Sequence, residues 1–495
     1  MGYNTITPTW VKDAIFYQIF PDRFARSIRV RKPNNLQDWD APPTVHGFKG
    51  GDLLGVLEKL DYLQNLGITA IYFTPIFQSA SNHRYHTHDY YQVDPLLGGN
   101  SAFHELLGEC HRRGMRIVLD GVFNHTSRGF FQFNHILECG SESPYMDWFD
   151  IKCFPLHAYE GKPNYRCWVG LPDLPEFNTQ NPQVRQYIFE VARYWIDQGI
   201  DGWRLDVPFC IDDDTFWQEF RRVVKDANPE AYIVGEVPWE AQRWLQGDQF
   251  DAVMNYQFTQ ACLGFFGGDR IDRNMEKNMM GLPPTPVLDA LAFVRRSEAL
   301  LKLYPNQVSL AQMNLLDSHD MPRFPSLVNY DAASIKLAVL FQMTYPGAPC
   351  IYYGDEVGLR NGSRRIPEDC RYAFPWDEQR WDHELLGYFK KVISLRNTQP
   401  ALRQGQFIPL HAEGQIIIFL RQLVSEENVV VINNSTVVFN STIPVRNHLA
   451  EGTSWVNQLG NGEFSIIAGN ITGLHVAPRT GAVFTKSSFS LRQSA

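Results

Sequence analysis

The stretch GIDGWRLDVP at residues 199–208 places an arginine and an aspartate at the end of a run that otherwise looks ready for burial. Residues two apart in a strand point to the same face, so we expect Arg204 and Asp206 to project together. In a barrel of parallel strands, reacting groups come from the carboxyl ends of several strands. The stretch therefore predicts one barrel strand with a functional pair of charges at its end.

Seven other short apolar runs lie between residues 14 and 356, separated by helix-like segments. Continuously apolar strands are typical of parallel sheets that are covered on both faces. Eight such strands alternating with helices predict an α/β fold, a parallel (β/α)8 TIM barrel, and a doubly wound open sheet is the alternative. The seven runs are AIFYQIF (14–20), ITAIYF (68–73), RIVLD (116–120), AYIVGE (231–236), DAVMNY (251–256), MNLLDSHD (313–320) and CIYYGDE (350–356).

Two of the connecting segments show apolar residues at helical spacing. Gly199 ends the first predicted helix, whose apolar face consists of Val184, Tyr187, Ile188, Val191 and Trp195. Gly67 ends the second, whose apolar face consists of Leu53, Val56, Leu57 and Leu60.

Two regions depart from the barrel pattern. Residues 124–172 are too long for an ordinary connection and rich in aromatic residues, which predicts an inserted subdomain after the third strand. From about residue 404, the β-branched runs QIIIFL, NVVVIN and TVVFN predict a C-terminal antiparallel β-domain. The expected domains are a barrel of residues 1–123 and 173–403, the insertion 124–172 and a β-sandwich of residues 404–495.

Composition excludes several classes of protein. A formal charge of −9 argues against nucleic-acid binding, which needs a basic face. The N-terminus lacks an apolar core of signal-peptide length, and no uncharged stretch of about 18 residues occurs. We therefore expect a cytoplasmic protein with no membrane partner. The eight cysteines form no CxxC pair, which predicts neither a zinc site nor a disulfide framework, and we expect most of them to be buried.

Polar side chains close four of the apolar runs. A single aspartate at a strand end is usually a capping or ion-pairing residue, but several in register indicate a shared site. Three carboxylates at one rim are typical of glycoside hydrolases, in which one carboxyl group donates a proton and another attacks the sugar. The polar residues are Asp120, Asn124, His125, Arg204, Asp206, Glu236, His319 and Asp320.

The surroundings of two carboxylates suggest different roles. The guanidinium of Arg204 should lower the pKa of Asp206 and keep it ionised, as a nucleophile requires. Glu236 could lie against Trp239 in a drier setting, which would raise its pKa and keep it protonated as a general acid.

Four motifs resemble the signatures of the α-amylase family of glycoside hydrolases: DGVFNH (120–125), DGWRLDVP (201–208), GEVPWE (235–240) and LLDSHD (315–320). The resemblance implies that Asp206 is the nucleophile, Glu236 the general acid/base, and Asp320 a third carboxylate that binds sugar hydroxyls. It also implies that Asp120 supports the rim structurally. The implied substrate contacts are Arg204, His125, His319 and Tyr85, which stacks beneath the sugar, with Trp239 nearby on the leaving-group side.

The stretches FYQIFPDRF (16–24), 48–77 and FDAVMNY (250–256) resemble the neopullulanase, cyclomaltodextrinase and maltogenic amylase group. Members of that group open α-1,4 bonds in small or cyclic glucans, and many accept α-1,6 bonds. The group usually carries an N-terminal β-module that helps to form a shared active site in a dimer, whereas here the first strand is predicted near residue 14. A homodimer is therefore a possible partner arrangement, and the preference for cyclodextrins is open.

Three further departures bear on the site. Basic residues crowd RFARSIRVRKPNN (23–35), where relatives often have an Asn/Asp-rich calcium loop, so we expect no calcium there, although Asn124 leaves a second place for it. His86 replaces an acidic residue that often follows the stacking tyrosine. Trp239 lies one position later than the tryptophan of the familiar GEIW pattern.

These features predict a retaining α-glucan hydrolase without a cofactor, acting on malto-oligosaccharides and branched glucans with α-1,6 debranching ability. One alternative is a transglycosylase or isomerase of the same family, which uses the same covalent intermediate. Another is a non-catalytic amylase-like partner subunit. Such proteins usually lose the carboxylates that this chain keeps at Asp206, Glu236 and Asp320.

Overall fold

The computed structural model describes residues 7–277, 279, 281–362 and 366–487. The start of the predicted barrel domain and the end of the predicted β-sandwich domain therefore lie outside the described residues. The chain forms two compact units. The first comprises the chain up to Met254, with Ala311–Met313 and Arg371–Trp376. The second comprises Asn255–Leu310, Asn314–Cys370 and the chain from Asp377 onward.

The eight predicted strands form one sheet in the order β8-β7-β6-β5-β2-β1-β10-β9. A parallel bridge between Met254 and Met313 connects the two ends of that order, so the sheet is a nearly closed barrel. The predicted (β/α)8 barrel is confirmed, and the doubly wound alternative is wrong. The strands are β1 (Phe16–Ile19), β2 (Ala70–Phe73), β5 (Arg116–Gly121), β6 (Gly202–Leu205), β7 (Tyr232–Gly235), β8 (Ala252–Val253), β9 (Met313–Leu315) and β10 (Ala348–Tyr352).

Burial explains why these runs do not alternate. Every residue of β1, β2, β6, β7 and β10 is buried. A strand covered on both faces gains from apolar side chains at every position, because neither face meets water.

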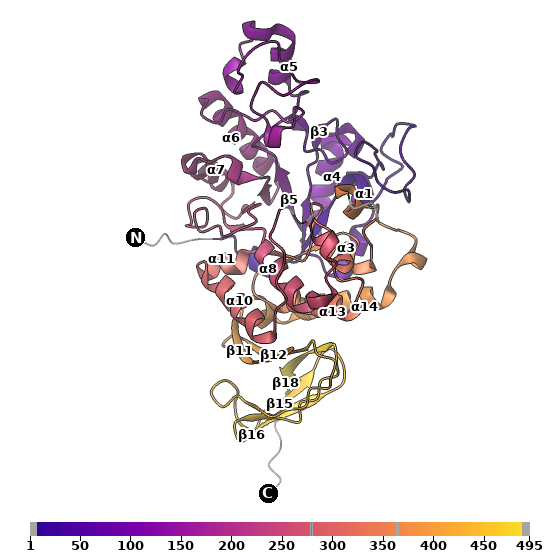
Figure 1. Ribbon diagram of the computed structural model, residues 1–495, viewed down its shortest axis with the longest axis vertical. Coiled ribbons are helices and arrows are strands. Elements are labelled where there is room, and N and C mark those ends of the chain that lie inside the picture. Colours follow the sequence, from indigo (N-terminus) through magenta and orange to yellow (C-terminus); the bar gives the residue numbers. More distant parts are fainter. Residues whose placement is uncertain (1–6, 278, 280, 363–365, 488–495) are drawn as a thin grey trace. The chain divides into compact units, whose positions relative to one another are not determined.

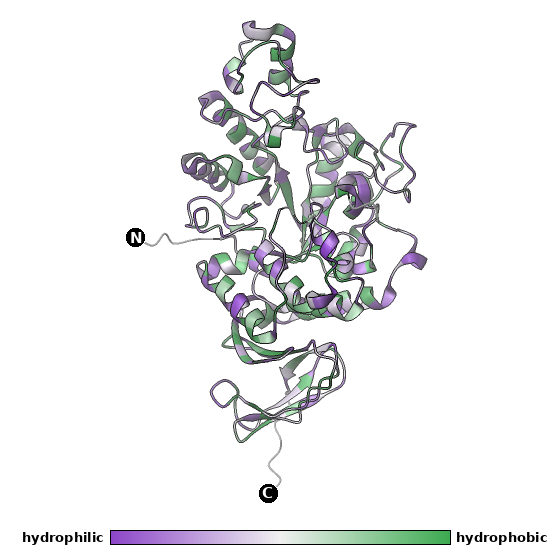
Figure 2. Cartoon of the chain, in the orientation of Figure 1, coloured by the Kyte–Doolittle hydropathy of each residue, from purple (hydrophilic) through white to green (hydrophobic). Residues whose placement is uncertain are grey.

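Three helices of the first unit follow the amphipathic pattern. The predicted helix is α6 (Pro182–Asp197), and Asn181 caps it by accepting a hydrogen bond from the backbone of Gln183. Asp213 caps α7 (Asp214–Ala227) in the same way, and α4 (Gly99–Arg112) precedes β5. Hydrophobic and hydrophilic residues alternate along α6 and α7, as helices with one buried face require (Figure 2).

The second predicted helix is interrupted. The structure forms α2 (Leu53–Leu57) and α3 (Leu60–Leu66), because Lys59 leaves the helical region with φ −109° and ψ 9°. Gly67 ends α3 at φ 94°, as expected. Gly55 lies inside α2 because a Cβ atom there would come within 2.3 Å of the Ala25 carbonyl oxygen, so only glycine allows this close approach.

Helices of the second unit include one that is buried on all sides. Ten of the thirteen residues of α13 (Ala332–Thr344) are buried, which explains its lack of a polar face. The other long helices of this unit are α10 (Ala290–Lys302) and α14 (His383–Thr398). Shorter ones are α8 (Tyr256–Cys262), α11 (Asn306–Ala311), α12 (Phe324–Leu327) and α15 (Pro400–Gln404).

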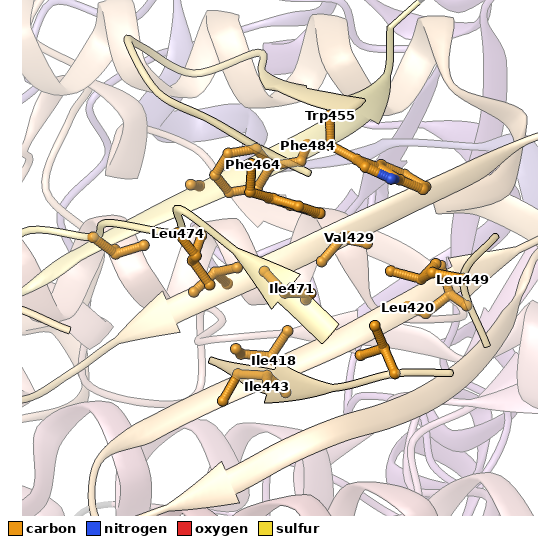
Figure 3. Packing of buried hydrophobic residues seen from close by; sticks show 14 of the residues in the cluster. Ile418, Leu420, Val429, Ile443, Leu449, Trp455, Phe464, Ile471, Leu474 and Phe484 are labelled. Carbon is orange, nitrogen blue, oxygen red and sulfur yellow. The ribbon is translucent and has the colours of Figure 1, made fainter. Parts of the chain in front are cut away.

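The C-terminal strands form an eight-stranded antiparallel sheet in the order β11-β12-β13-β18-β15-β16-β17-β14 (Figure 1). The predicted antiparallel arrangement of this region is confirmed. The side chains that face its interior make one apolar core, which includes Ile418, Val429, Trp455, Phe464 and Phe484 (Figure 3). The strands are β11 (Gln406–Glu413), β12 (Ile416–Gln422), β13 (Glu427–Asn433), β14 (Ile443–Pro444), β15 (Ser454–Asn457), β16 (Glu463–Ile467), β17 (Asn470–Thr472) and β18 (Thr480–Lys486).

One predicted strand of this region is wrong. TVVFN (436–440) is a loop in which Phe439 makes an isolated bridge to Val476. The amide of Asn433 and the hydroxyl of Ser435 both donate to the Val437 carbonyl, at 2.8 and 3.0 Å. These local bonds use an acceptor that a strand would give to its neighbour.

Two features interrupt the alternation of barrel strands and helices. Residues 124–172 contain α5 (Phe131–Cys139) and short bridges, among them Ile151 to Tyr165, around packed aromatic rings. A hairpin of β3 (Phe77–Ser79) and β4 (Thr87–Val93), which the sequence analysis did not predict, lies between β2 and β5. The boundaries of the inserted subdomain and of the other domains stay predictions.

Four of the eight cysteines are buried, so the expectation that most of them are buried is wrong. Cys139 and Cys153 are exposed, and Cys167 and Cys210 are half-buried. Within the described part of the chain, no helix combines the length and the apolar character that crossing a membrane requires.

Candidate active site

The register of three parallel strands brings four predicted site residues together. Asp120 in β5 pairs with Arg204 in β6, and Leu205 pairs with Gly235 in β7. Asp206 and Glu236 directly follow β6 and β7, so their side chains leave the same edge of the sheet. We call Asp120, Arg204, Asp206 and Glu236 the Arg204 centre.

One guanidinium contacts all three carboxylates of this centre. Nη1 of Arg204 lies 2.9 and 3.0 Å from the two oxygens of Asp120 and 3.0 Å from Oδ1 of Asp206. Nη2 lies 2.8 Å from Oε1 of Glu236. Arg204 is fully buried, so these carboxylates take the place of water around its charge.

The charges of the centre determine its electrostatics. Burial alone would lower the pKa of Arg204, but the carboxylates of Asp120 and Glu236 raise it well above the usual value, so the guanidinium stays charged. If all three carboxyl groups ionise, one positive charge faces three negative ones. The excess of negative charge in a buried site stabilises a cation, such as the oxocarbenium-like transition state of glycoside cleavage.

The carboxylate of Asp120 is bound by other side chains of the protein. The hydroxyl groups of Tyr72 and Tyr85 both donate to its Oδ2, at 2.8 and 2.9 Å, in addition to the contact with Arg204. A carboxylate whose oxygens are occupied by three protein donors is poorly placed to attack a substrate. The supporting role of Asp120 stays a prediction.

Asp206 and Glu236 have different surroundings. Asp206 is 8% exposed, against 1% for Asp120 and 2% for Glu236, so it is the most accessible carboxylate of the three. Oε2 of Glu236 accepts a hydrogen bond of 3.1 Å from the backbone N–H of Val207. The Trp239 ring contacts the ring of Phe209, with 4.7 Å between the centroids. The packing of Trp239 against Glu236 stays a prediction.

Val207, between Asp206 and the following turn, has an unusual backbone. It adopts φ 35° and ψ 50°, the left-handed region, although valine is β-branched. Such conformations cost about 1–3 kcal/mol and persist where surrounding structure holds them. Here the strained residue supplies the N–H that bonds Glu236. The sequence carries no signal for this conformation, because glycine is the residue expected at positive φ.

His125 lies beside Asp206 and is buried. Its Nε2 is 4.0 Å from Oδ2 of Asp206, and its ring stacks on Trp168 at 5.4 Å and 24°. Burial, assisted by the nearby His86, lowers the pKa of His125 to about 3, so the ring is neutral at neutral pH. Trp168 belongs to the inserted segment, and the sequence analysis did not single it out, because only the aromatic content of that segment was apparent.

Tyr85 and His86 lie in the loop between β3 and β4. Tyr85 reaches the centre through its hydroxyl bond to Asp120. The His86 ring packs against His83 at 5.0 Å, and burial lowers its pKa. A neutral imidazole therefore directly follows Tyr85.

The remaining predicted residues belong to the second unit. His319 is fully buried, and its Nε2 lies 2.9 Å from Oδ2 of Asp320, whose side chain is partly exposed. The thiol of Cys370 donates to the His319 carbonyl at 3.1 Å. The structure thus brings Asp206 with Glu236 in the first unit and His319 with Asp320 in the second.

Arg323, which sequence reasoning missed, anchors the turn after Asp320. Its Nη1 lies 2.7 Å from Oδ1 of Asp355, and Asp317 accepts a 2.5 Å hydrogen bond from the backbone of Phe324. Burial raises the pKa of both carboxyl groups, Asp317 and Asp355. The turn is therefore fixed by buried polar contacts on both of its sides.

In the basic segment 23–35, where relatives were expected to have a calcium loop, Lys32 binds two oxygen atoms of neighbouring elements. Nζ of Lys32 lies 3.0 Å from Oδ2 of Asp52 and 2.6 Å from the Leu96 carbonyl oxygen. No group of three or more His, Cys, Asp or Glu side chains in the described ranges is arranged to hold a metal ion. The expectation of no calcium stays a prediction.

Comparison with known proteins gives one family match, to the alpha amylase catalytic domain over residues 18–374. A cyclomaltodextrinase of Bacillus sp is 46% identical over 431 residues, which cover 86% of this chain and 74% of the relative. Neopullulanase 2 of Thermoactinomyces vulgaris is 43% identical over 438 residues, covering 86% and 70%. An intracellular maltogenic amylase of Bacillus subtilis (strain 168) is 38% identical over 397 residues, covering 80% and 63%.

Among solved structures, the native form of the Nostoc punctiforme debranching enzyme is 49% identical to this chain. The match covers 98% of this chain and all of the other, with a TM-score of 0.87. The likeness therefore includes the barrel, the insertion and the C-terminal sheet.

Proposed function

The chain belongs to the α-amylase family of glycoside hydrolases, and from this premise we propose that it is a retaining hydrolase of α-glucans that opens α-1,6 and α-1,4 glucosidic bonds. The observation that carries the proposal is the Arg204 guanidinium, which holds Asp206 on one nitrogen and Glu236 on the other. Two carboxyl groups that contact neighbouring nitrogens of one guanidinium can serve as the nucleophile and the acid/base of a retaining enzyme.

In the first step, an oxygen of Asp206 attacks the anomeric carbon while protonated Glu236 gives its proton to the glycosidic oxygen. The bond to the leaving sugar breaks, and a covalent glucosyl ester forms on Asp206. Arg204 holds Asp206 through Oδ1, which leaves Oδ2 directed away from that contact. Neutral His125, 4.0 Å from Oδ2, is placed to bond a sugar hydroxyl beside it.

In the second step, Glu236 removes a proton from water, and the hydroxide oxygen attacks the anomeric carbon and releases Asp206. Two inversions give net retention. Glu236 must gain and lose a proton in each cycle, and its two oxygens differ in their partners, Arg204 and the Val207 N–H. We propose that Asp320, whose Oδ2 lies 2.9 Å from Nε2 of His319, binds sugar hydroxyls.

Support for debranching comes from two sides. The debranching enzyme of Nostoc punctiforme resembles this chain over nearly its full length. Within the chain, the neutral imidazole of His86 directly follows Tyr85, and a neutral imidazole changes which sugar hydroxyls can be bonded.

The test is a digest of maltohexaose, β-cyclodextrin, pullulan and a branched maltodextrin, with products resolved by length and linkage and the first-formed anomer identified by NMR. We expect α-anomeric products and loss of branch points. Rapid cleavage of maltohexaose and cyclodextrin with intact branch points would show the debranching part to be wrong. A β-anomeric first product would show the retaining mechanism to be wrong.

The cellular setting and assembly are also proposals. The name of the intracellular maltogenic amylase relative supports a cytoplasmic location, with an α-glucan as the only partner required. We propose a homodimer by analogy with the group, and light scattering of the purified protein tests it. A monomer at micromolar concentration would contradict it.

A further inference from the structure

Two buried carboxyl groups outside the Arg204 centre are in contact with each other. Asp317 is 2% exposed and Asp355 is 6% exposed, and the two groups form a hydrogen bond. Two ionised carboxylates offer only acceptors, so a hydrogen bond between them requires a proton on one of the two. We call Asp317 and Asp355 the acid pair.

One guanidinium serves the acid pair. Nη1 of Arg323 lies 2.7 Å from Oδ1 of Asp355, and the backbone N–H of Phe324 donates to Oδ2 of Asp317 at 2.5 Å. Nη2 of Arg323 is buried and has no hydrogen-bond partner in the part of the chain that the structure describes. One positive charge thus pairs with one carboxylate, and the second carboxyl group is more stable in this buried place when it keeps a proton.

The titratable groups around the acid pair come from its own turn, from the end of β10 and from the 3-10 turn Pro367–Cys370. The guanidinium of Arg323 lies 4.2 and 5.0 Å from the ring centroids of Tyr352 and Tyr353. Burial raises the pKa of Asp317, and burial together with the carboxyl group of Asp317 raises that of Asp355 well above its usual pKa, while Arg323 opposes both shifts. Other titratable neighbours on these elements are His319, Asp320, Glu356 and Cys370.

Arg323 and Cys370 connect the acid pair to the residues predicted to contact the sugar. Nε of Arg323 donates to the Cys370 carbonyl at 3.1 Å, and the Cys370 thiol donates to the His319 carbonyl at 3.1 Å. Nε2 of His319 in turn lies 2.9 Å from Oδ2 of Asp320. A displacement of Arg323 would therefore reach His319 and Asp320 through these contacts.

We propose that Asp317 and Asp355 are positioning residues that share one proton, and that this proton holds the turn of His319 and Asp320 in the shape that binds sugar hydroxyls. The inference rests on the proposed function, which makes Asp320 a sugar contact. When the shared proton is lost at high pH, two carboxylates repel each other and compete for one guanidinium. Arg323 then shifts, and the contacts through Cys370 to His319 loosen.

The substrate α-maltosyl fluoride separates the shared proton from the proton of Glu236. Asp206 attacks the anomeric carbon, the carbon–fluorine bond breaks, and fluoride leaves with the electron pair without taking a proton from Glu236. Since kcat/KM covers the steps up to this irreversible one, deprotonation of Glu236 at high pH should not lower it. A loss of kcat/KM that remains at high pH reports on another group.

The experiment measures kcat/KM on the fluoride for wild type, Asp317→Asn and Asp355→Asn, from pH 6 upward over the range in which circular dichroism shows every protein folded. Each single variant keeps one carboxylate beside Arg323 and has no shared proton to lose. We expect the wild-type value to fall about tenfold across this range, and the value of either variant to change less than about twofold. Because the change is taken within each protein, a uniform loss of activity does not affect it.

Asp251→Asn is the matched control for removal of a buried carboxylate. Asp251 is fully buried, but Arg221 and Lys225 each lie 2.8 Å from it, so two cations balance its charge. This variant should keep the wild-type fall at high pH.

Two variants of Cys370 test the connection to His319. Cys370→Ala removes the donor to the His319 carbonyl and should lower kcat/KM about threefold at pH 6, whereas Cys370→Ser keeps a donor and should lie closer to wild type. An alanine variant with the wild-type value would overturn this connection.

Three further outcomes would overturn the inference: a wild type that does not respond to high pH, single Asn variants that fall as wild type does, or an Asp251→Asn enzyme that loses the fall. Asp320→Asn tests the proposed function separately, because it should lower kcat/KM about 10²-fold at every pH on both maltodextrin and the fluoride. An unchanged Asp320→Asn enzyme, or a wild type that cleaves neither substrate, would contradict the proposed function itself.

Discussion

The Arg204 centre and the C-terminal core are both closed to water, but they are built from opposite materials. In the centre, one guanidinium faces three carboxyl groups and a valine holds a strained backbone. In the core, which includes Ile418, Trp455 and Phe464, apolar side chains pack against one another. Burial of apolar surface stabilises a fold directly, whereas burial of charge is costly unless each group is paired.

The difference teaches where activity and stability reside. The centre keeps charges and strain that a fold selected for stability alone would replace, and they are there for chemistry. The core has no such groups and contributes only to stability. We therefore expect substitutions in the centre to change turnover more than unfolding, and substitutions in the core to do the reverse.

The largest expected effect is the loss of turnover in Asp206→Asn. Removing the nucleophile should lower kcat on maltodextrin by a factor on the order of 10⁴ to 10⁶, as in other enzymes that lose a covalent nucleophile. The thermal midpoint should stay the same or rise, because one of three crowded carboxylates is gone. Residual activity above about one hundredth of wild type would break the comparison, because another group would then have to act as the nucleophile.

Trp455→Ala should have the largest effect on stability. Trp455 is fully buried, and its ring stacks on Phe464 at 5.8 Å and 12°. The cavity should cost about 3–5 kcal/mol of unfolding free energy, measured by urea denaturation. Activity per folded molecule, measured well below the transition, should equal that of wild type. A large drop in kcat without loss of stability would contradict the division between the two regions.

Arg204→Lys sharpens the comparison, because it keeps the positive charge but replaces the planar guanidinium, with its several nitrogens, by a single ammonium nitrogen. An ammonium group cannot contact Asp120, Asp206 and Glu236 with separate nitrogens, so the nucleophile loses its fixed orientation. We expect kcat to fall about 10²-fold, with a smaller change in KM. Arg396→Lys provides a matched control, because Arg396 is also buried but donates to carbonyl oxygens such as that of Gly347. It should change stability more than kcat.

The smallest predicted effect, for each pH unit, is a change of stability with pH. His125 has a folded pKa of about 3, below the value near 6.5 in the unfolded chain. Between these values, only the unfolded state takes up the proton, so stability falls as pH decreases from about 6.5 towards 3. In His125→Asn, this part of the slope, at most about 1.4 kcal/mol per pH unit, should vanish. Parallel urea midpoints for both proteins from pH 4 to 7 would contradict the shift.

The strands and the shared edge of the sheet could be predicted because apolar runs and period-two spacing report burial and direction. Arg204 and Asp206 could be placed together by that spacing alone. Val207, Trp168 and Phe209 could not, because a left-handed valine, a stacking partner from an inserted segment and a ring contact between two loops depend on tertiary packing. TVVFN failed for a related reason, since local side-chain bonds from Asn433 and Ser435 outweighed β-propensity.

The two-residue spacing of Arg204 and Asp206 in and after β6 also limits how relatives of this chain can vary in length. Loops at the barrel rim can gain or lose residues without moving a strand. A single residue inserted between Leu205 and Asp206, or deleted there, would turn the aspartate to the opposite face of the sheet and separate it from its arginine. Insertions and deletions should therefore accumulate in rim loops that do not contact the Arg204 centre, while this short interval keeps its length.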